Sequence, residues 1–373
     1  MDPCAEAERL LGEAWGAPVS CEMSAALRHP GWRNGVWRLV VRGGPAEHVI
    51  VKACFSEGGG YAPSDRTPVS AFQRLANEWC GAAMLGPLGL GPKIIAGDMT
   101  SGVVVLEDLG GGHMLADVLR GNDPVAAEVA LFAYARSLGD LHAATVGSQA
   151  RWASLQAARG ASPVSPLSAP FAPLMAALPT FCEAIEIAPP GGLADDVAAI
   201  VATLDDPGAY LAFTPADCCP DNHFLRGERV QFFDCERAAM RHALLDAAYL
   251  LAPFPTCWCC AALPADLPVR LLAAYRGQFP GGPDFEDQMT LILAAWVITR
   301  IGSRGGVDWL QADRPWGLSS VRQRVRAVTG NLLARPNLAS LLPAFAALMA
   351  EADSRLAERW PDLAPMALYP AFA

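Results

Sequence analysis

A short β-hairpin with polar side chains at its open end is the feature that most constrains the fold of this chain. Residues 222–225 and 229–233 have the composition of two short strands, and Gly227 lies in the turn between them. Antiparallel pairing places the two ends of such a hairpin side by side. Asn222 and Asp234, at those two ends, should therefore be neighbours.

The side chains at this open end are typical of a magnesium site. An amide oxygen from Asn222 and a carboxylate from Asp234 are hard oxygen ligands, which suit Mg²⁺ held together with substrate phosphates. Asp217 precedes Asn222 by five positions on a loop that contains Pro220, so its carboxylate is expected to face a group bound beside the metal. Asp217 is therefore the candidate catalytic residue, and Asn222 and Asp234 are the candidate metal ligands.

This spacing resembles the catalytic loop and metal-binding Asp of kinases, where an Asp precedes an Asn by five positions and a second Asp follows a short hairpin. Within that superfold the sequence is similar to the aminoglycoside phosphotransferase family of small-molecule kinases, which usually have His-Gly-Asp at the loop and then Pro-Asp-Asn. Residues 220–222 match the second motif. The first motif differs, because Pro215 and Ala216 precede Asp217.

The resemblance implies an α+β, bilobal protein-kinase-like fold, with a small N-terminal antiparallel β-sheet lobe and a larger, mainly helical C-terminal lobe. Residues 1–107 would bind the nucleotide, and residues 108–373 would form the catalytic and substrate-binding lobe. The implied activity is ATP-dependent transfer of the γ-phosphate to a hydroxyl of a small molecule, such as an aminoglycoside-like compound or an amino alcohol, with Mg²⁺. A nucleotide-binding pseudokinase with impaired catalysis is the alternative, because Pro215 removes a backbone donor from the loop.

A lysine inside an apolar strand is the second informative feature. Residues 33–41 and 48–55 are expected to form two paired strands around a turn at residues 43–45. Only two of the 28 basic residues are lysines, Lys52 and Lys93. A lysine in the middle of the second strand therefore indicates a cation buried for use rather than an edge charge that reaches out to water.

A candidate partner for Lys52 lies on the next predicted helix. Apolar residues recur at helical spacing from Ala71 to Leu85, and Glu78 borders that apolar face. An acid in this position favours a cationic partner, although an ordinary solvated glutamate is the alternative. By the kinase resemblance, a Lys52–Glu78 ion pair would hold the lysine against the α- and β-phosphates of the nucleotide.

The resemblance also implies where the remaining nucleotide contacts and the loop support lie. The apolar run 103–107 is expected to be a buried strand leading into the hinge between the lobes, where backbone groups near Glu107 and Leu109 would pair with the adenine edge. A turn covering the nucleotide would lie at residues 31–35, which lack the G-x-G-x-x-G pattern. Asp246, in an apolar helical stretch, is expected to accept backbone hydrogen bonds and to anchor the catalytic loop.

Composition argues against several classes of protein. The net charge of −10 is opposite to that of a general nucleic-acid binder. No secretory signal is visible, and the apolar runs are interrupted well short of a membrane span. The 11 cysteines are expected to be free thiols in a reducing cytoplasm. Cys257 and Cys260 have the spacing of a redox or metal-binding pair, but burial as small apolar side chains beside a pocket is the favoured interpretation.

Overall fold

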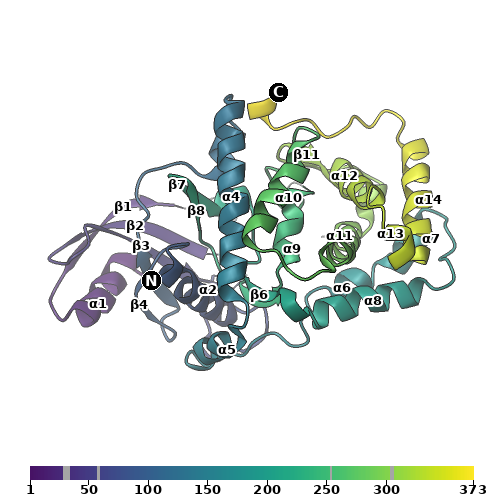
Figure 1. Cartoon of the computed structure of the whole chain (residues 1–373). Helices are drawn as coiled ribbons and strands as arrows, with labels where there is room; N and C mark the ends of the chain where they lie inside the picture. The colour runs from purple at the N-terminus through teal and green to yellow at the C-terminus, as the bar shows by residue number, and fades with distance from the viewer. Residues whose placement is uncertain (28–33, 57–58, 253, 303–305) are drawn as a thin grey trace.

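Two lobes make up the described part of the chain, one built on a β-sheet and the other mainly helical (Figure 1). The computed structural model describes residues 1–27, 34–56, 59–252, 254–302 and 306–373. The predicted α+β fold, with a small sheet lobe and a larger helical lobe, is confirmed. Within these ranges no helix has both the length and the apolar character that crossing a bilayer requires.

A five-stranded antiparallel sheet forms the N-terminal lobe, in the spatial order β1-β2-β3-β5-β4. Its strands are β1 (Ser20–Ala26), β2 (Asn34–Arg42), β3 (His48–Cys54), β4 (Ile94–Asp98) and β5 (Val103–Glu107). The three strands predicted from the sequence correspond to β2, β3 and β5. Lys52 lies on β3, between Val36 of β2 and Val104 of β5, so it is at the centre of the sheet and not at an edge.

Helices cover both faces of this sheet. α1 (Pro3–Trp15) packs on the face that carries Val51, and α2 (Ala71–Leu85) packs on the opposite face, which carries Cys54. Side chains alternate along a strand, so Lys52 lies on the same face as Cys54. The period of two along β3 therefore directs the lysine towards α2.

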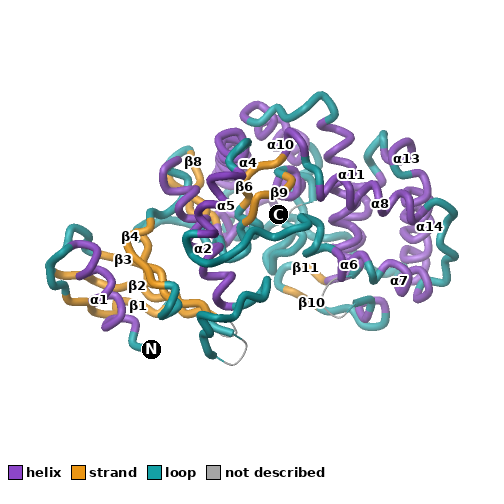
Figure 2. The backbone as a smooth tube through the Cα atoms, turned by 90° about the horizontal axis from the view of Figure 1, so that it is seen from below, coloured by secondary structure: helices purple, strands orange, loops and turns teal. Residues whose placement is uncertain are grey.

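The C-terminal lobe is built mainly of helices, with three short two-stranded ribbons. The ribbons pair β6 (Leu211–Thr214) with β9 (Ala239–His242), β7 (His223–Arg226) with β8 (Arg229–Phe232), and β10 (Pro315–Trp316) with β11 (Ser319–Ser320). The helices are α3 (Leu115–Leu119), α4 (Pro124–Thr145), α5 (Gln149–Ala157), α6 (Ala172–Met175), α7 (Leu178–Ala184), α8 (Leu193–Asp205), α9 (Leu244–Ala247), α10 (Leu267–Gln278), α11 (Phe285–Ile301), α12 (Val321–Leu333), α13 (Leu338–Leu341) and α14 (Pro343–Arg359). Figure 2 shows the N-terminal sheet at one end of the molecule and α13 and α14 at the other.

α4, in the larger lobe, helps to fix the position of the β7–β8 ribbon. It begins where Asp123 Oδ1 accepts hydrogen bonds from Val125 N and Ala126 N at 3.0 Å, which satisfies two of the unpaired amides at a helix start. Further along α4, Ser137 Oγ accepts a hydrogen bond from Val230 N at 3.0 Å. The buried side of α4 therefore holds the β7–β8 ribbon directly.

Candidate functional site

The predicted hairpin is present as β7 and β8. The two strands pair in antiparallel register, and Gly227 has φ +60° in the turn between them. Phe233 N donates a hydrogen bond to Asn222 O at 3.2 Å, beyond the last pair of the ribbon. Asn222 and Asp234 therefore come from adjacent backbone segments.

The loop that carries Asp217 closes onto Asn222. Asn222 Nδ2 donates to Asp217 O at 3.2 Å, and Asn222 N donates to Cys219 O at 2.9 Å. Because the amide nitrogen of the Asn222 side chain is bound in this way, the amide oxygen is the atom left for a ligand.

Ala216, before Asp217, has a backbone conformation that suits glycine. Its φ is +64°, in the left-handed region that costs an L-residue roughly 1–2 kcal/mol. Glycine is usual here in the family that the sequence resembles. The loop therefore has a glycine-like backbone although the residue has a side chain.

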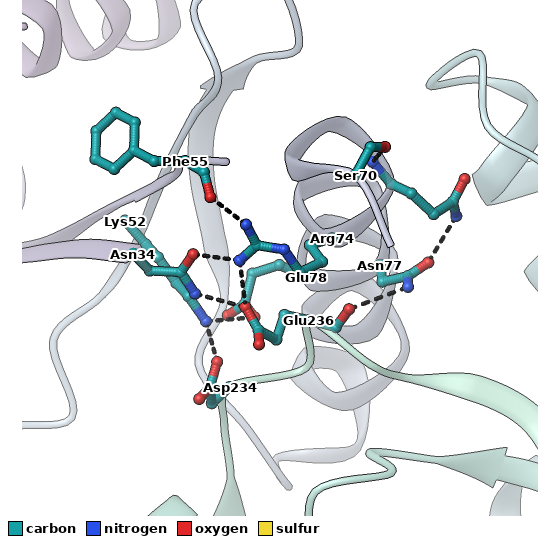
Figure 3. Close-up of polar contacts among 10 residues, drawn as sticks. Asn34, Lys52, Phe55, Ser70, Arg74, Asn77, Glu78, Asp234 and Glu236 are labelled. Atoms are coloured by element: carbon teal, nitrogen blue, oxygen red, sulfur yellow. Dashed lines mark hydrogen bonds and ion pairs between the residues drawn. The ribbon is translucent and has the colours of Figure 1, made fainter. Parts of the chain in front are cut away.

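Lys52 joins two acidic residues from different lobes (Figure 3). Lys52 Nζ lies 2.7 Å from Glu78 Oε2 on α2 and also contacts Asp234 Oδ1, which follows β8. Lys52 is 5% exposed and Glu78 is 2% exposed, so the ion pair is buried. The predicted pairing of Lys52 with Glu78 is present, and the interpretation of Glu78 as a solvated glutamate is wrong.

Two carboxylates share this one ammonium group. Burial alone would lower the pKa of Lys52, but Asp234 and Glu78 hold it well above its usual value. Burial raises the pKa of Glu78 to about 7 against the opposing effect of Lys52, and the charge of Asp234 adds to the rise. A cation that binds Asp234 would therefore gain a carboxylate ligand. It would also reduce the competition between Asp234 and Glu78 for the ammonium group of Lys52.

The carboxylate of Asp217 has the properties of a base. Burial raises the pKa of Asp217 to about 6, and the negative charge of Asp234 adds to the rise. The Cys219 side chain and Arg237 act in the opposite direction without cancelling it. A carboxylate of this kind is ionised at neutral pH but holds a proton much more strongly than an ordinary Asp does.

A second cluster of buried charges joins the two lobes, and no sequence motif marked it (Figure 3). Glu236 Oε2 accepts hydrogen bonds from Asn34 Nδ2 at 2.6 Å and from Arg74 Nη1 at 2.9 Å. Asn77 Nδ2 donates to Glu236 O at 3.1 Å. Burial would raise the pKa of Glu236, but Lys52, Asn34 and Arg74 lower it to about 2, so this side chain is ionised near neutral pH.

A signal for this second cluster does exist in the sequence. Arg74 lies four positions before Glu78, which puts both charges on one side of α2. A charged residue on the buried side of a helix needs a partner. That partner, Glu236, is 162 positions away, so helical periodicity alone could not identify it.

α2 approaches the chain after β8 closely at Gly81. A Cβ on Gly81 would lie 2.4 Å from Cys235 Cβ, closer than two carbons can be. Glycine at position 81 therefore lets the helix lie against the residue that follows Asp234.

The predicted hinge residues Glu107 and Leu109 lie within the described part of the chain. Glu107 N donates to Lys93 O at 2.8 Å, and Glu107 Oε2 accepts from Lys93 N at 3.2 Å, so the amide and carboxylate of Glu107 are occupied within the protein. Among the described residues, neither the amide nor the carbonyl of Leu109 has a hydrogen-bond partner. The expected nucleotide-covering turn lies partly outside the described residues, at 31–33, and Asn34 begins β2.

Asp246 is fully buried, as its apolar surroundings predicted, but its expected backbone donors are wrong. Its carboxylate contacts the guanidinium of Arg241 and lies 3.8 Å from His142 Nε2. Arg241 Nε also donates to Thr214 Oγ1 at 2.5 Å, at the end of β6. A buried carboxylate costs less when it is paired with a charged donor, and here that donor also reaches Thr214, just before the loop that carries Asp217.

Comparisons with known proteins found similar solved structures. A choline/ethanolamine kinase family protein from Mesorhizobium loti is 19% identical, with 92% of this chain and 99% of that chain covered and a TM-score of 0.44. Macrolide 2′-phosphotransferase from Brachybacterium faecium is 19% identical, with 76% of this chain and 84% of that chain covered and a TM-score of 0.43. Choline kinase from Streptococcus pneumoniae is 16% identical, with 84% of this chain and 92% of that chain covered and a TM-score of 0.41. No protein-family model and no curated protein matches the chain.

Proposed function

We propose that this protein is an ATP-dependent phosphotransferase that transfers the γ-phosphate to a hydroxyl of a small molecule, with an aminoglycoside-like compound or an amino alcohol as the acceptor. The observation that carries the proposal is the position of Lys52 Nζ between Glu78 on α2 and Asp234 after β8. In kinases, a strand lysine paired with a helix glutamate acts together with a metal-binding Asp to hold the phosphates. The same residue types meet here from the same kinds of elements.

Lys52 and Glu78 would bind the nucleotide phosphates. The ammonium of Lys52 neutralises negative charge on the α- and β-phosphates, and Glu78 keeps it in place from the rigid α2 helix. Because the pair is buried, its electrostatic effect is stronger than that of an exposed pair. Leu109, whose backbone groups have no partner among the described residues, would bind the adenine edge at the boundary between a nucleotide-binding lobe, residues 1–107, and a catalytic lobe, residues 108–373.

Asn222 and Asp234 have the donor set for Mg²⁺. The side-chain oxygen of Asn222 and the carboxylate of Asp234 are hard ligands, and the Asp234 side chain keeps 33% of its surface exposed beside Lys52. When bound, Mg²⁺ neutralises charge on the phosphates and orients them. Asp234 would then be a ligand of the metal as well as a partner of Lys52.

Asp217 would act on the acceptor. Its carboxylate orients the hydroxyl and accepts the hydroxyl proton as the oxygen attacks the γ-phosphate. The transition state of phosphoryl transfer is loose, so positioning and charge neutralisation account for most of the acceleration. Arg241, held by Asp246, would keep the start of this loop in place as structural support.

The alternative, a nucleotide-binding pseudokinase with impaired catalysis, depends only on the loop that carries Asp217. Pro215 and Ala216 replace His-Gly, but Ala216 adopts φ +64° and Asn222 Nδ2 closes onto Asp217 O. These two observations favour a loop that still presents Asp217. A protein that binds nucleotide without acceptor-dependent turnover would support the alternative.

The test is a screen for acceptor-dependent ADP formation with ATP and Mg²⁺ across aminoglycosides, amino alcohols and sugars. We expect at least one acceptor to raise ADP release well above the rate without acceptor. Lys52→Met should raise the KM for ATP by roughly 10–100-fold, the effect of losing a charge-assisted interaction. Lys93→Met removes the other lysine and should leave the KM unchanged; equal effects of the two variants would contradict the proposed role of Lys52.

The pH dependence of turnover follows from Asp217. A base with a pKa of about 6 must lose its proton before it can act, so kcat/KM should fall as pH drops below about 6. The fall should approach tenfold per pH unit, as for any single group that must be deprotonated. The measurement is kcat/KM for the acceptor at saturating nucleotide, over a range of roughly pH 5 to 8 that brackets this pKa. A flat profile through this range would contradict Asp217 as the base.

A further inference from the structure

Two cysteine thiols and one carboxylate lie close together at the loop that carries Asp217. Cys219 Sγ, a carboxylate oxygen of Asp221 and Cys257 Sγ all lie within 4.8 Å of one another. Cys257 Sγ is 3.7 Å from Asp221 Oδ1. Ligand atoms around a tetrahedral Zn²⁺, with bonds of about 2.0–2.3 Å, lie roughly 3.3–3.8 Å apart. The three atoms are therefore within a small side-chain adjustment of a metal-binding arrangement.

The carboxylate in this group is already oriented. Trp258 Nε1 donates to Asp221 Oδ2 at 2.7 Å, which leaves Oδ1 towards Cys257 Sγ. Arg324, 2% exposed, holds the neighbouring backbone through Cys257 O and, at 3.3 Å, Trp258 O. Metal ligands are commonly oriented by such hydrogen bonds from outside the coordination sphere.

The sequence pair Cys257 and Cys260 is not the pair that the fold brings together. Cys260 Sγ lies 3.7 Å from Met366 Sδ, whereas Cys257 Sγ lies 3.0 Å from Cys259 Sγ. Cys219, Cys257 and Cys259 are free thiols in the structure. Cys259 thus places a further thiol next to Cys257.

The charges around the group also suit a bound cation. Two thiolates and one carboxylate around a divalent ion leave one net negative charge. Arg300 donates to Pro255 O at 3.3 Å, two positions before Cys257. A half-buried guanidinium therefore lies close to the segment that contains Cys257 and carries a charge opposite to the remaining one.

We propose that Cys219, Asp221 and Cys257 form a binding site for a thiophilic divalent cation, for which Zn²⁺ is the appropriate probe. On binding, the two thiol protons leave to solvent and two metal–sulfur bonds form. Thiolates select Zn²⁺ over Mg²⁺, which prefers oxygen, so this site is distinct from the one proposed at Asn222 and Asp234.

The bound ion would join the catalytic loop to the segment that contains Cys257. Cys219 and Asp221 flank Pro220, and Asp221 directly precedes Asn222. Cys257 belongs to a different segment, which Arg324 holds through a hydrogen bond to Cys257 O. A metal bridge would therefore restrict movement of the loop between Asp217 and Asn222. This inference does not depend on the proposed phosphotransfer, because its test measures metal binding and not turnover.

The experiment measures binding of Zn²⁺ to the reduced, chelator-treated full chain by competition with a chromophoric chelator, and the absorption of the Co²⁺-substituted protein. We expect one Zn²⁺ per chain, no displacement by excess Mg²⁺, and a thiolate-to-cobalt charge-transfer band. Cys219→Ser and Cys257→Ser should abolish the band, and Cys21→Ser should keep it. Trp258→Phe, which removes the hydrogen bond to Asp221, should weaken binding by roughly 10–100-fold.

A measurement on the unaltered chain covers the case in which a variant fails to fold. Cys219 and Cys21 are both half-buried, so their alkylation by iodoacetamide can be compared directly by mass spectrometry. Zn²⁺ should slow the alkylation of Cys219 and leave that of Cys21 unchanged. Equal effects at both cysteines, or a Co²⁺ spectrum without a thiolate band, would overturn the proposal.

Discussion

Asp217→Asn is expected to lower turnover by roughly 10²–10⁴-fold, the usual effect of losing general-base catalysis, while nucleotide binding stays nearly unchanged. Asparagine keeps the shape of the side chain but cannot accept the hydroxyl proton as a carboxylate does. The measurements are kcat in the acceptor-dependent ADP assay and the nucleotide affinity by calorimetry. Unchanged kcat with a confirmed acceptor would contradict the role of Asp217.

The same substitution is expected to stabilise the fold. The folded-state pKa of Asp217, about 6, is above the ordinary value of an Asp. The folded state therefore binds more protons, and the contribution of Asp217 to stability is lost as pH rises through the interval from roughly 4 to 6. At neutral pH the ionised side chain destabilises the fold, so its replacement by Asn should raise the midpoint of thermal unfolding.

A matched control separates these effects from a general response to losing a carboxylate. Asp195→Asn, at an exposed position near the start of α8, should change neither kcat nor the unfolding midpoint. A variant that is more stable but much less active is the expected result for a catalytic residue whose buried charge destabilises the fold. A parallel loss of stability and activity at position 217 would instead indicate a structural role.

Local periodicity predicted the parts of the fold that one segment specifies by itself. The hairpin of β7 and β8 follows from two short strands and a turn at Gly227, and Lys52 is marked by its place in an apolar strand. Glu78 follows from its position at the edge of an apolar helix face. Each of these residues carries its signal within a few positions of itself.

Interactions between distant segments were beyond that reasoning. Glu236 pairs with Arg74 and Asn34 across the lobes, and Asp246 lies 3.8 Å from His142 Nε2 on α4. In both cases burial of a charge could be inferred from the sequence, but the partner is selected by tertiary packing. The backbone conformation of Ala216 is a similar case, because a left-handed φ at alanine is set by the loop and not by local preference.

Asp234→Asn is expected to reduce Mg²⁺-dependent nucleotide binding by roughly 100-fold or more, since loss of a metal ligand should exceed the 10–100-fold effect of losing an outer hydrogen bond. Asp234 has φ +61°, a conformation that asparagine tolerates, so the substitution removes the charge without straining the backbone. Lys52 should then pair with Glu78 alone. The pKa of Glu78 should fall, because the charge of Asp234 contributes to its rise.

Calorimetric titration of ATP with and without Mg²⁺ distinguishes a metal ligand from a residue that only positions Lys52. If Asp234 binds the metal, Asp234→Asn should remove the difference between the two titrations, whereas Lys52→Met should weaken both and retain the difference. Asp195→Asn serves again as the control and should behave as the unaltered chain does. Wild-type affinity of Asp234→Asn for ATP in the presence of Mg²⁺ would rule out Asp234 as the metal ligand. It would also remove the main reason for the proposed phosphotransferase function, because Lys52 would then lie between two acids that serve only the fold.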